Sequence, residues 1–255
     1  YIMKGTAQVI CSQTVKVCGI GESSVETQIK DLIDAQTNPT LATYAKTGEV
    51  HIRVTALEEN EKAARKLLKP VVKELKNRFG NAIYTTEEGV TLEKAVVDLL
   101  KANELTVTCA ESCTGGMLSA RLIDVPGVSE VYKSGLVTYS NKAKRRFLGV
   151  KKASLQKYGA VSRQVAEEMA KGVALLTRSD VSVAVTGIAG PDGGTEEKPV
   201  GLVYIACSVK GKVTVEKYQF TGNRAKVREA AVSAALTLLR GCILKHFSEV
   251  TFGKA

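Results

Sequence analysis

Residues 105–116 read Leu-Thr-Val-Thr-Cys-Ala-Glu-Ser-Cys-Thr-Gly-Gly, and they decide the expected fold of the longer part of the chain. Leu105 to Ala110 carries no charge, which is typical of a strand buried in a sheet that is covered on both faces. Helical spacing follows from Gly115 to Ile123. A buried strand that leads directly into a helix predicts an α/β domain built in layers.

The same alternation of element types continues over residues 91–255. The strands at 202–209 and 213–220 are joined at Gly211 and resemble a hairpin, so the sheet is expected to be mixed rather than purely parallel. We therefore predict a three-layer α/β domain with a mixed sheet. Its further strands are expected at 131–139 and 181–186, and its further helices at 92–101, up to Leu148, from Ser162 to Thr177, and at 225–245.

Residues 1–90 predict a small α+β module. Strands are expected at 14–20, 40–46 and 49–57, and a helix is expected after Ser23 and Ser24, which can cap it. A second helix is expected from Glu58 to Phe79, with Gly80 ending it. The polar run at 85–89 is the expected boundary, which gives domains at 1–90 and 91–255.

Composition excludes several classes of protein. With 24% charged and 44% hydrophobic residues, the chain of 255 is not expected to be disordered. No window approaches the roughly 18 apolar residues of a membrane span, so no membrane partner is expected. The six cysteines form no CxxC pair, which favours reduced thiols and a cytoplasmic location. His51 and His246 lie far apart, so we expect no metal site and catalysis without histidine.

The net charge of +10 is unevenly distributed along the chain. Residues 1–90 hold 12 Lys and Arg against 11 Asp and Glu, whereas residues 91–255 hold 24 against 15. A basic surface attracts phosphate, in nucleic acid, in a nucleotide or at a membrane. Lysines that only solvate the surface would give the same count, so charge alone leaves the partner open.

The turn that follows the strand at 105–110 is the first candidate site. Ser112 is a candidate nucleophile or phosphate ligand, and Gly115 and Gly116 let a ligand approach the backbone N–H groups of a helix start. Alternatively, Ser112 and Thr114 cap the helix while Glu111 lies near its positive end.

Residues 139–144, Tyr-Ser-Asn-Lys-Ala-Lys, form the second candidate site. They follow a strand, and Asn141 is a plausible helix cap. A serine nucleophile needs a base, and a lysine or tyrosine with a lowered pKa can replace histidine. A Tyr–Lys pair beside Ser112 would suit amide hydrolysis. Alternatively, an exposed tyrosine precedes a solvated basic turn.

A glycine-rich segment at 186–201 forms the third candidate site. It holds five glycines and two prolines and follows an apolar strand, which suits either a ligand-binding loop or a flexible lid. It matches neither the P-loop nor the dinucleotide fingerprint, so it names no ligand. A plain connecting loop is the alternative.

Four motifs in one order resemble the C-terminal domain of the CinA family. They are AESCTGG at 110–116, TYSNKAK at 138–144, GAVS at 159–162 and TGIAGPDGGTEEKPVG at 186–201, with a looser match at 221–228. Residues 1–90, with GIGES at 19–23 and the run at 38–56, resemble the family's KH-like middle domain. Full-length relatives carry a further N-terminal domain similar to molybdopterin-binding proteins, and its absence here would explain a chain that opens on Tyr1.

The resemblance implies nicotinamide mononucleotide deamidase activity, which hydrolyses the carboxamide to nicotinic acid mononucleotide and ammonia without a cofactor. The family's proposed nucleophile, tyrosine and lysine fall on Ser112, Tyr139 and Lys144. A homodimer is also implied. Backbone N–H groups at 114–116 are expected to hold an oxyanion or the phosphate, and three arginines are candidate phosphate partners. The expected substrate-binding residues are Glu111, Thr114, Gly115, Gly116, Asn141, Arg145, Thr186, Gly187, Gly190, Arg224 and Arg228.

Two other functions remain open at this point. A KH domain clamps nucleic acid with a GxxG loop, but the glycines of residues 1–90 lie at 5, 19, 21, 48, 80 and 89, and no two are three apart. A nucleic-acid partner is therefore not expected, and the module is expected to be a connector. A domain of the same fold that senses a nucleotide without turnover is the other alternative.

Overall fold

The structure is a computed structural model that describes residues 8–252, with side chains up to residue 248. Its contacts divide the chain into two compact units, Tyr1–Thr91 and Leu92–Ala255.

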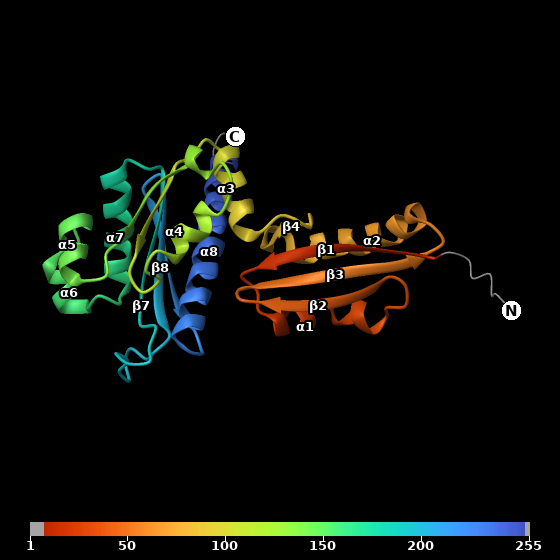
Figure 1. Cartoon of the computed structure of the whole chain (residues 1–255), viewed down its shortest axis with the longest axis horizontal. Helices are drawn as coiled ribbons and strands as arrows, with labels where there is room; N and C mark the ends of the chain where they lie inside the picture. Colours follow the sequence, from red (N-terminus) through yellow and green to blue (C-terminus); the bar gives the residue numbers. More distant parts are fainter. Residues whose placement is uncertain (1–7, 253–255) are drawn as a thin grey trace. The chain divides into compact units, whose positions relative to one another are not determined.

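The smaller unit is a four-stranded antiparallel sheet with two helices, in the chain order β-α-β-β-α-β of a split βαβ fold (Figure 1). The strand order is β2-β3-β1-β4. The predicted α+β module is confirmed, although the short last strand was not predicted. The elements are β1 (Val9–Cys18), α1 (Glu22–Asp34), β2 (Thr40–Lys46), β3 (Glu49–Glu58), α2 (Glu61–Phe79), a 3-10 turn (Gly80–Ala82) and β4 (Ile83–Thr85).

Alternation along the strands builds the core of the smaller unit. Val50, Ile52 and Val54 are buried against α1 and α2, while the residues between them are more exposed. Asn60 caps α2 by accepting the Ala63 N–H at 2.9 Å. The predicted serine cap of α1 is wrong, because this helix begins at Glu22 after Gly21, and both serines lie inside it.

The larger unit contains a five-stranded mixed sheet in the order β6-β5-β7-β8-β9. Strand β5 is parallel to both of its neighbours, whereas β8 is antiparallel to both β7 and β9, which confirms the predicted mixed sheet. The strands are β5 (Val107–Glu111), β6 (Tyr132–Val137), β7 (Val181–Gly187), β8 (Leu202–Val209) and β9 (Lys212–Gln219).

Helices cover both faces of this sheet and complete the predicted three layers (Figure 1). One outer layer contains α3 (Leu92–Ala102), α4 (Met117–Ile123) and α8 (Arg224–Phe252), and a 3-10 turn (Val128–Glu130) follows α4. The other outer layer contains α5 (Asn141–Leu148), α6 (Lys152–Tyr158) and α7 (Arg163–Thr177). Helix α6 was not predicted, and α4 begins at Met117, two residues later than expected.

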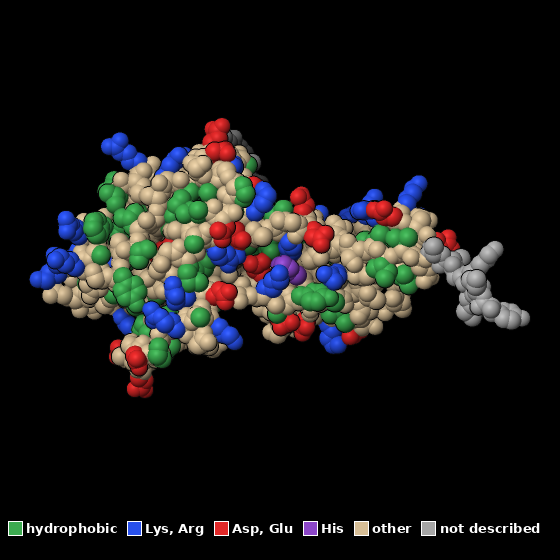
Figure 2. Space-filling view, viewed as in Figure 1, with side chains coloured by type: hydrophobic (Ala, Val, Ile, Leu, Met, Phe, Trp, Pro, Cys, Tyr) green, Lys and Arg blue, Asp and Glu red, His purple; other side chains and the backbone are tan. Residues whose placement is uncertain are grey.

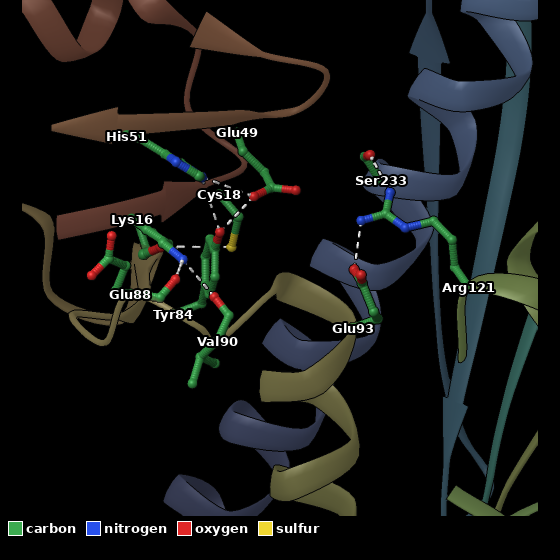
Figure 3. A network of polar contacts seen from close by, with 11 residues as sticks. Lys16, Cys18, Glu49, His51, Tyr84, Glu88, Val90, Glu93, Arg121 and Ser233 are labelled. Atoms are coloured by element: carbon green, nitrogen blue, oxygen red, sulfur yellow. Dashed lines mark hydrogen bonds and ion pairs between the residues drawn. The ribbon is translucent and has the colours of Figure 1, made fainter. Parts of the chain in front are cut away.

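Polar contacts anchor segments within each unit, as Figure 3 shows. In the smaller unit, the buried Lys16 ammonium donates to the carbonyl oxygens of Glu88 and Val90 at 2.6 and 2.7 Å. In the larger unit, Arg121 of α4 donates to Glu93 of α3 and to the hydroxyl of Ser233 in α8, at 2.6 and 3.0 Å. The three helices of that layer are thus joined by a single guanidinium.

A helix glycine sets the spacing in the opposite layer. A Cβ placed on Gly172 of α7 would lie 1.9 Å from the carbonyl oxygen of Leu148, the last residue of α5. The two helices can therefore approach this closely only because residue 172 has no side chain.

The sheet brings two of the candidate sites to one edge. All five residues of β5 are buried, and β7 is buried except at its last residue, as expected for strands covered on both faces. Because β5 and β7 are parallel, their carboxyl ends lie together, and Ser112 and the loop after Gly187 follow these ends directly. No helix within residues 8–252 combines the length and apolar character that a bilayer crossing needs.

Candidate active site

Ser112 and Lys144 form the centre of the candidate active site. Lys144 is 1% exposed, and its ammonium donates to Ser112 Oγ at 2.9 Å. It also donates to the carbonyl oxygens of Thr138 and Tyr139, at 2.8 and 3.3 Å. The serine follows β5, and the lysine lies in the first turn of α5, which follows the neighbouring strand β6. Two of the three predicted catalytic residues are therefore in direct contact.

Capping fixes the start of the helix that carries the lysine. Ser140 Oγ accepts the Ala143 N–H at 3.1 Å, so Ser140 is the cap of α5. The predicted cap, Asn141, is wrong by one residue. Its side chain is exposed at the first helical position, and it does not line the cavity described below.

The environment of Lys144 suits a proton acceptor. Burial lowers the pKa of Lys144 from its ordinary 10.5 to about 8. About one tenth of the amine is then neutral at pH 7, compared with less than one part in a thousand for an ordinary lysine. The neutral amine can remove the proton of Ser112 across the 2.9 Å hydrogen bond.

The cysteine next to the serine remains a thiol. Cys113 is buried beside the cavity, and burial raises its pKa to about 11. A protonated thiol is a poor nucleophile. The chemistry at this turn therefore favours Ser112.

A cavity of about 250 Å³ opens in front of the Ser112 hydroxyl. Its walls come from the ends of β5 and β7, the start of α5, the turn between α6 and α7, and the first residue of α8. Of the predicted residues, the cavity brings together Ser112, Tyr139, Lys144, Thr186, Gly187, Gly190 and Arg224. It also contains Ala160, Val161, Asp192 and Gly193, to which the sequence analysis gave no individual role although they lie in its GAVS and glycine-rich motifs.

Hydrogen bonds hold the glycine-rich segment against the turn between α6 and α7. Thr186 Oγ1 donates to the Ala160 carbonyl at 2.9 Å. The Lys198 ammonium donates to the carbonyls of Tyr158 and Val161, at 2.5 and 2.9 Å. The Thr186 hydroxyl therefore shapes the wall of the cavity, and in the predicted contact of Thr186 with substrate this hydroxyl could act only as an acceptor.

Glu111 caps helix α4 and is closed to any ligand. Its side chain is fully buried, and one carboxylate oxygen accepts the N–H groups of Gly116 and Leu118, at 2.9 and 3.1 Å. The other accepts the N–H and the hydroxyl of Ser119, at 2.9 and 2.6 Å. The structure gives Glu111 this role in place of the predicted substrate contact, because negative charge stabilises the N-terminus of a helix.

The two glycines of this turn allow its backbone conformation, but their N–H groups are not free to bind a ligand. Gly115 and Gly116 have φ values of +60° and +98°, a region that other residues rarely adopt. Their N–H groups are both occupied, since Gly115 donates to the Ser112 carbonyl at 3.1 Å and Gly116 donates to Glu111. The predicted use of these N–H groups for an oxyanion or a phosphate is therefore contradicted.

The three candidate arginines have different positions. Arg224 lines the cavity and donates to the Gly190 carbonyl at 2.8 Å and to the Tyr139 hydroxyl at 3.2 Å. Arg228 donates to the carbonyls of Cys113 and Thr114 and does not line the cavity. Arg145 is exposed on α5 and does not line it either. Only Arg224 is therefore placed to meet a ligand phosphate there.

Tyr139 lies at the rim of the cavity. Its side chain is 62% exposed, and the hydroxyl bonds to Arg224 rather than to Ser112 or to the ammonium of Lys144. Thr114 is buried, and its hydroxyl has no hydrogen-bond partner among the described residues. Neither side chain takes part in the Ser112–Lys144 contact.

Basic side chains do not form one continuous patch on the face that Figure 2 shows. Lysines and arginines there are scattered and interspersed with acidic side chains. The excess charge of residues 91–255 therefore gives no evidence, on that face, of a surface that tracks a nucleic-acid backbone.

Comparison with protein families gives two matches. The model of the CinA C-terminal domain matches residues 89–243, and the model of the damage-inducible protein CinA KH domain matches residues 12–85. The putative competence-damage inducible protein of Clostridium beijerinckii is 51% identical over 96% of this chain. A CinA-like protein of Dictyoglomus thermophilum is 47% identical, also over 96%. The chain spans about 60% of the length of these relatives.

Solved structures resemble the larger unit. The competence/damage inducible protein CihA of Agrobacterium tumefaciens is 43% identical, with a TM-score of 0.57, over 58% of this chain and 91% of that one. A CinA superfamily protein of Klebsiella pneumoniae is 35% identical, with a TM-score of 0.59, over 60% of this chain and 96% of that one.

Proposed function

The chain belongs to the CinA family, and on that premise we propose that its larger unit is an amidohydrolase that converts nicotinamide mononucleotide to nicotinic acid mononucleotide and ammonia. The observation that carries the proposal is the 2.9 Å hydrogen bond between Ser112 and a buried lysine whose pKa is lowered to about 8. A serine paired with a base at the edge of a cavity is the arrangement that acyl transfer needs.

The first half of the proposed reaction forms an ester on Ser112. Neutral Lys144 takes the hydroxyl proton while Ser112 Oγ attacks the carboxamide carbon, and the resulting C–O bond gives a tetrahedral oxyanion. When the intermediate collapses, the C–N bond breaks and Lys144 returns the proton to the departing ammonia. The proton count balances within the Ser112–Lys144 pair, so histidine is not required.

The second half restores the serine. Water enters the position that ammonia leaves, Lys144 takes one of its protons, and hydroxide attacks the ester carbon. Collapse releases the carboxylic acid and returns the proton to Ser112 Oγ. Among the backbone N–H groups that follow Ser112, those of Cys113 and Thr114 are the candidate oxyanion donors, because Gly115 and Gly116 already have acceptors.

The rim of the cavity is assigned to substrate binding. We assign Arg224 to the 5′-phosphate, since its guanidinium lines the cavity and arginine binds phosphate in a fork. Tyr139 is assigned to the substrate beside it, in place of the proton transfer inferred from the family, because its hydroxyl bonds to Arg224.

Ammonia release from nicotinamide mononucleotide tests the proposal. Ser112→Ala and Lys144→Met are expected to remove the activity, whereas Lys142→Met, on an exposed position of the same helix, is expected to retain it. Undiminished release by Ser112→Ala would exclude the serine mechanism. Binding of the nucleotide without release by the unaltered chain would instead indicate a nucleotide sensor. Light scattering of the same preparation tests the homodimer that family membership suggests.

A further inference from the structure

Arg228 reaches the catalytic turn from a distant part of the chain. It lies in the second turn of α8, and its Nε donates to the Cys113 carbonyl at 3.0 Å. Its Nη2 donates to the next carbonyl, that of Thr114, at 2.8 Å. The planar guanidinium thus holds two successive peptide groups directly after Ser112, at residues that are 5% and 0% exposed.

The geometry of the peptide bond determines where the N–H of Thr114 points when Arg228 binds the Cys113 carbonyl. In a trans peptide the C=O and the following N–H point in opposite directions. The carbonyl of Cys113 shares its peptide with the N–H of Thr114, so an arginine bound to that carbonyl turns this N–H away from itself. Within residues 8–252 the Thr114 N–H has no hydrogen-bond acceptor.

The neighbouring peptide is already fixed at both ends. The Thr114 carbonyl accepts from Arg228, and the N–H of the same peptide, that of Gly115, donates to the Ser112 carbonyl. Glu111 accepts the N–H groups of Gly116 and Leu118. The turn is therefore held by a carboxylate and a guanidinium, and among the described residues it leaves the N–H of Thr114, two residues after the nucleophile, without an acceptor.

We propose that Arg228 is a positioning residue that aims the Thr114 N–H at the oxyanion formed when Ser112 attacks, a role that rests on the amidohydrolase proposed above. A charged donor on the carbonyl also polarises the peptide and strengthens the N–H as a donor. Arg228 thus acts through the backbone, and a substrate phosphate is not its ligand.

Two substrates separate this role from phosphate binding. Arg228→Ala is expected to lower kcat by about 10²–10³-fold, the loss typical for one oxyanion donor, on nicotinamide mononucleotide and on the phosphate-free nicotinamide riboside alike. KM is expected to change little. Arg224→Ala is the matched contrast, and it is expected to raise KM for the mononucleotide and not for the riboside. A rise in KM for the mononucleotide alone in Arg228→Ala would overturn the proposal.

Chemical rescue excludes a general loss of structure. Free guanidinium ion is expected to restore part of the kcat of Arg228→Ala and none of that of Lys144→Met. Arg228→Lys, which keeps the charge but cannot bind both carbonyls, is expected to fall between the alanine variant and the unaltered chain. A kcat in Arg228→Ala equal to that of the unaltered chain would also overturn the proposal.

Covalent labelling tests the same role without the proposed substrate. A fluorophosphonate probe reacts when Ser112 Oγ displaces fluoride at phosphorus, and its phosphoryl oxygen then occupies the oxyanion position. Arg228→Ala is expected to slow labelling by a similar factor. If the unaltered chain labels at Ser112 but releases no ammonia, the substrate assignment fails and the labelling rates decide on Arg228. If it neither labels nor hydrolyses, both proposals fail.

Discussion

Replacing Lys144 by methionine is expected to remove a pH-dependent destabilisation of the folded protein together with the activity. The folded chain holds this amine in a buried site, where burial lowers the pKa of Lys144 from 10.5 to about 8. The unfolded chain protonates the amine at its ordinary pKa. The folded state is therefore penalised as the pH falls through the interval between the two pKa values.

The size of this penalty follows from the pKa shift. Each unit of difference is worth about 1.4 kcal/mol, so an interval from 10.5 to about 8 corresponds to about 3 kcal/mol. The penalty is absent above pH 10.5, grows as the pH falls towards 8, and is constant below 8, where both states carry the proton. Methionine matches the length of the lysine stem and carries no proton. The lost hydrogen bonds to Ser112 and two carbonyls contribute an offset that does not follow this curve.

Urea unfolding of the two proteins between pH 7 and pH 10.5 measures the effect. The free energy of unfolding of Lys144→Met, minus that of the unaltered chain, is expected to rise by about 3 kcal/mol from pH 10.5 to pH 8 and then to level off. The difference cancels the other titrating groups. Lys142→Met controls for the loss of a lysine from the same helix. A difference that is flat over this pH range would refute the lowered pKa, and the role of Lys144 as base would lose its physical support.

Three other predictions follow from the site and its supports. In the unaltered chain, kcat/KM for ammonia release is expected to rise about tenfold per pH unit up to about pH 8 and then level off, because the neutral amine of Lys144 is the base; a rate that falls over this range would contradict it. Lys198→Met is expected to raise KM more than it lowers kcat, because the wall of the cavity loses its bonds to Tyr158 and Val161, and steady-state kinetics would show the split. Gly172→Ala is expected to destabilise the fold by about 1–3 kcal/mol in urea unfolding, whereas Gly241→Ala, in open space on α8, should be neutral or stabilising by up to about 1 kcal/mol; equal effects would argue against the close contact with Leu148.

The layered fold could be predicted because its strands and long helices carry strong periodic patterns. Strands β5 and β7 are mostly apolar, and their few polar side chains are buried as well, since both faces of the sheet are covered; the apolar part of this pattern is visible without coordinates. Strand β4 was missed because three residues are too few to establish a period. Helix α6 was missed because its buried residues are only Ser154 and Leu155, which make no apolar stripe.

The site could be predicted only in part. The turn at Ser112, the run that contains Lys144 and the loop after β7 were found because they follow strands that end at one edge of the sheet, whereas Lys144 was selected within its run through the resemblance to the CinA family. The place of Glu111 at the start of α4 agrees with the alternative that the sequence left open. The partners of Tyr139 and Arg228 could not be found, because side-chain geometry decides them and Arg228 lies 115 residues from Cys113. Glu111, next to the nucleophile, and Arg228, near the predicted phosphate site, were both predicted to contact substrate. In the structure, Glu111 binds backbone N–H groups and Arg228 binds backbone carbonyls.

The close contact at Gly172 affects the active site as well as the stability of the fold. Lys144 lies one helical turn before Leu148 on α5, so the backbone contact of Leu148 with α7 constrains the position of the helix that carries the amine towards Ser112. Residue 172 therefore influences how closely the Lys144 amine approaches Ser112, although it lies on another helix. A mutational scan of this protein should find substitutions of residue 172 that still fold but lose activity. A laboratory evolution experiment could use this position to change the distance between Lys144 and Ser112 without altering any residue that a substrate touches.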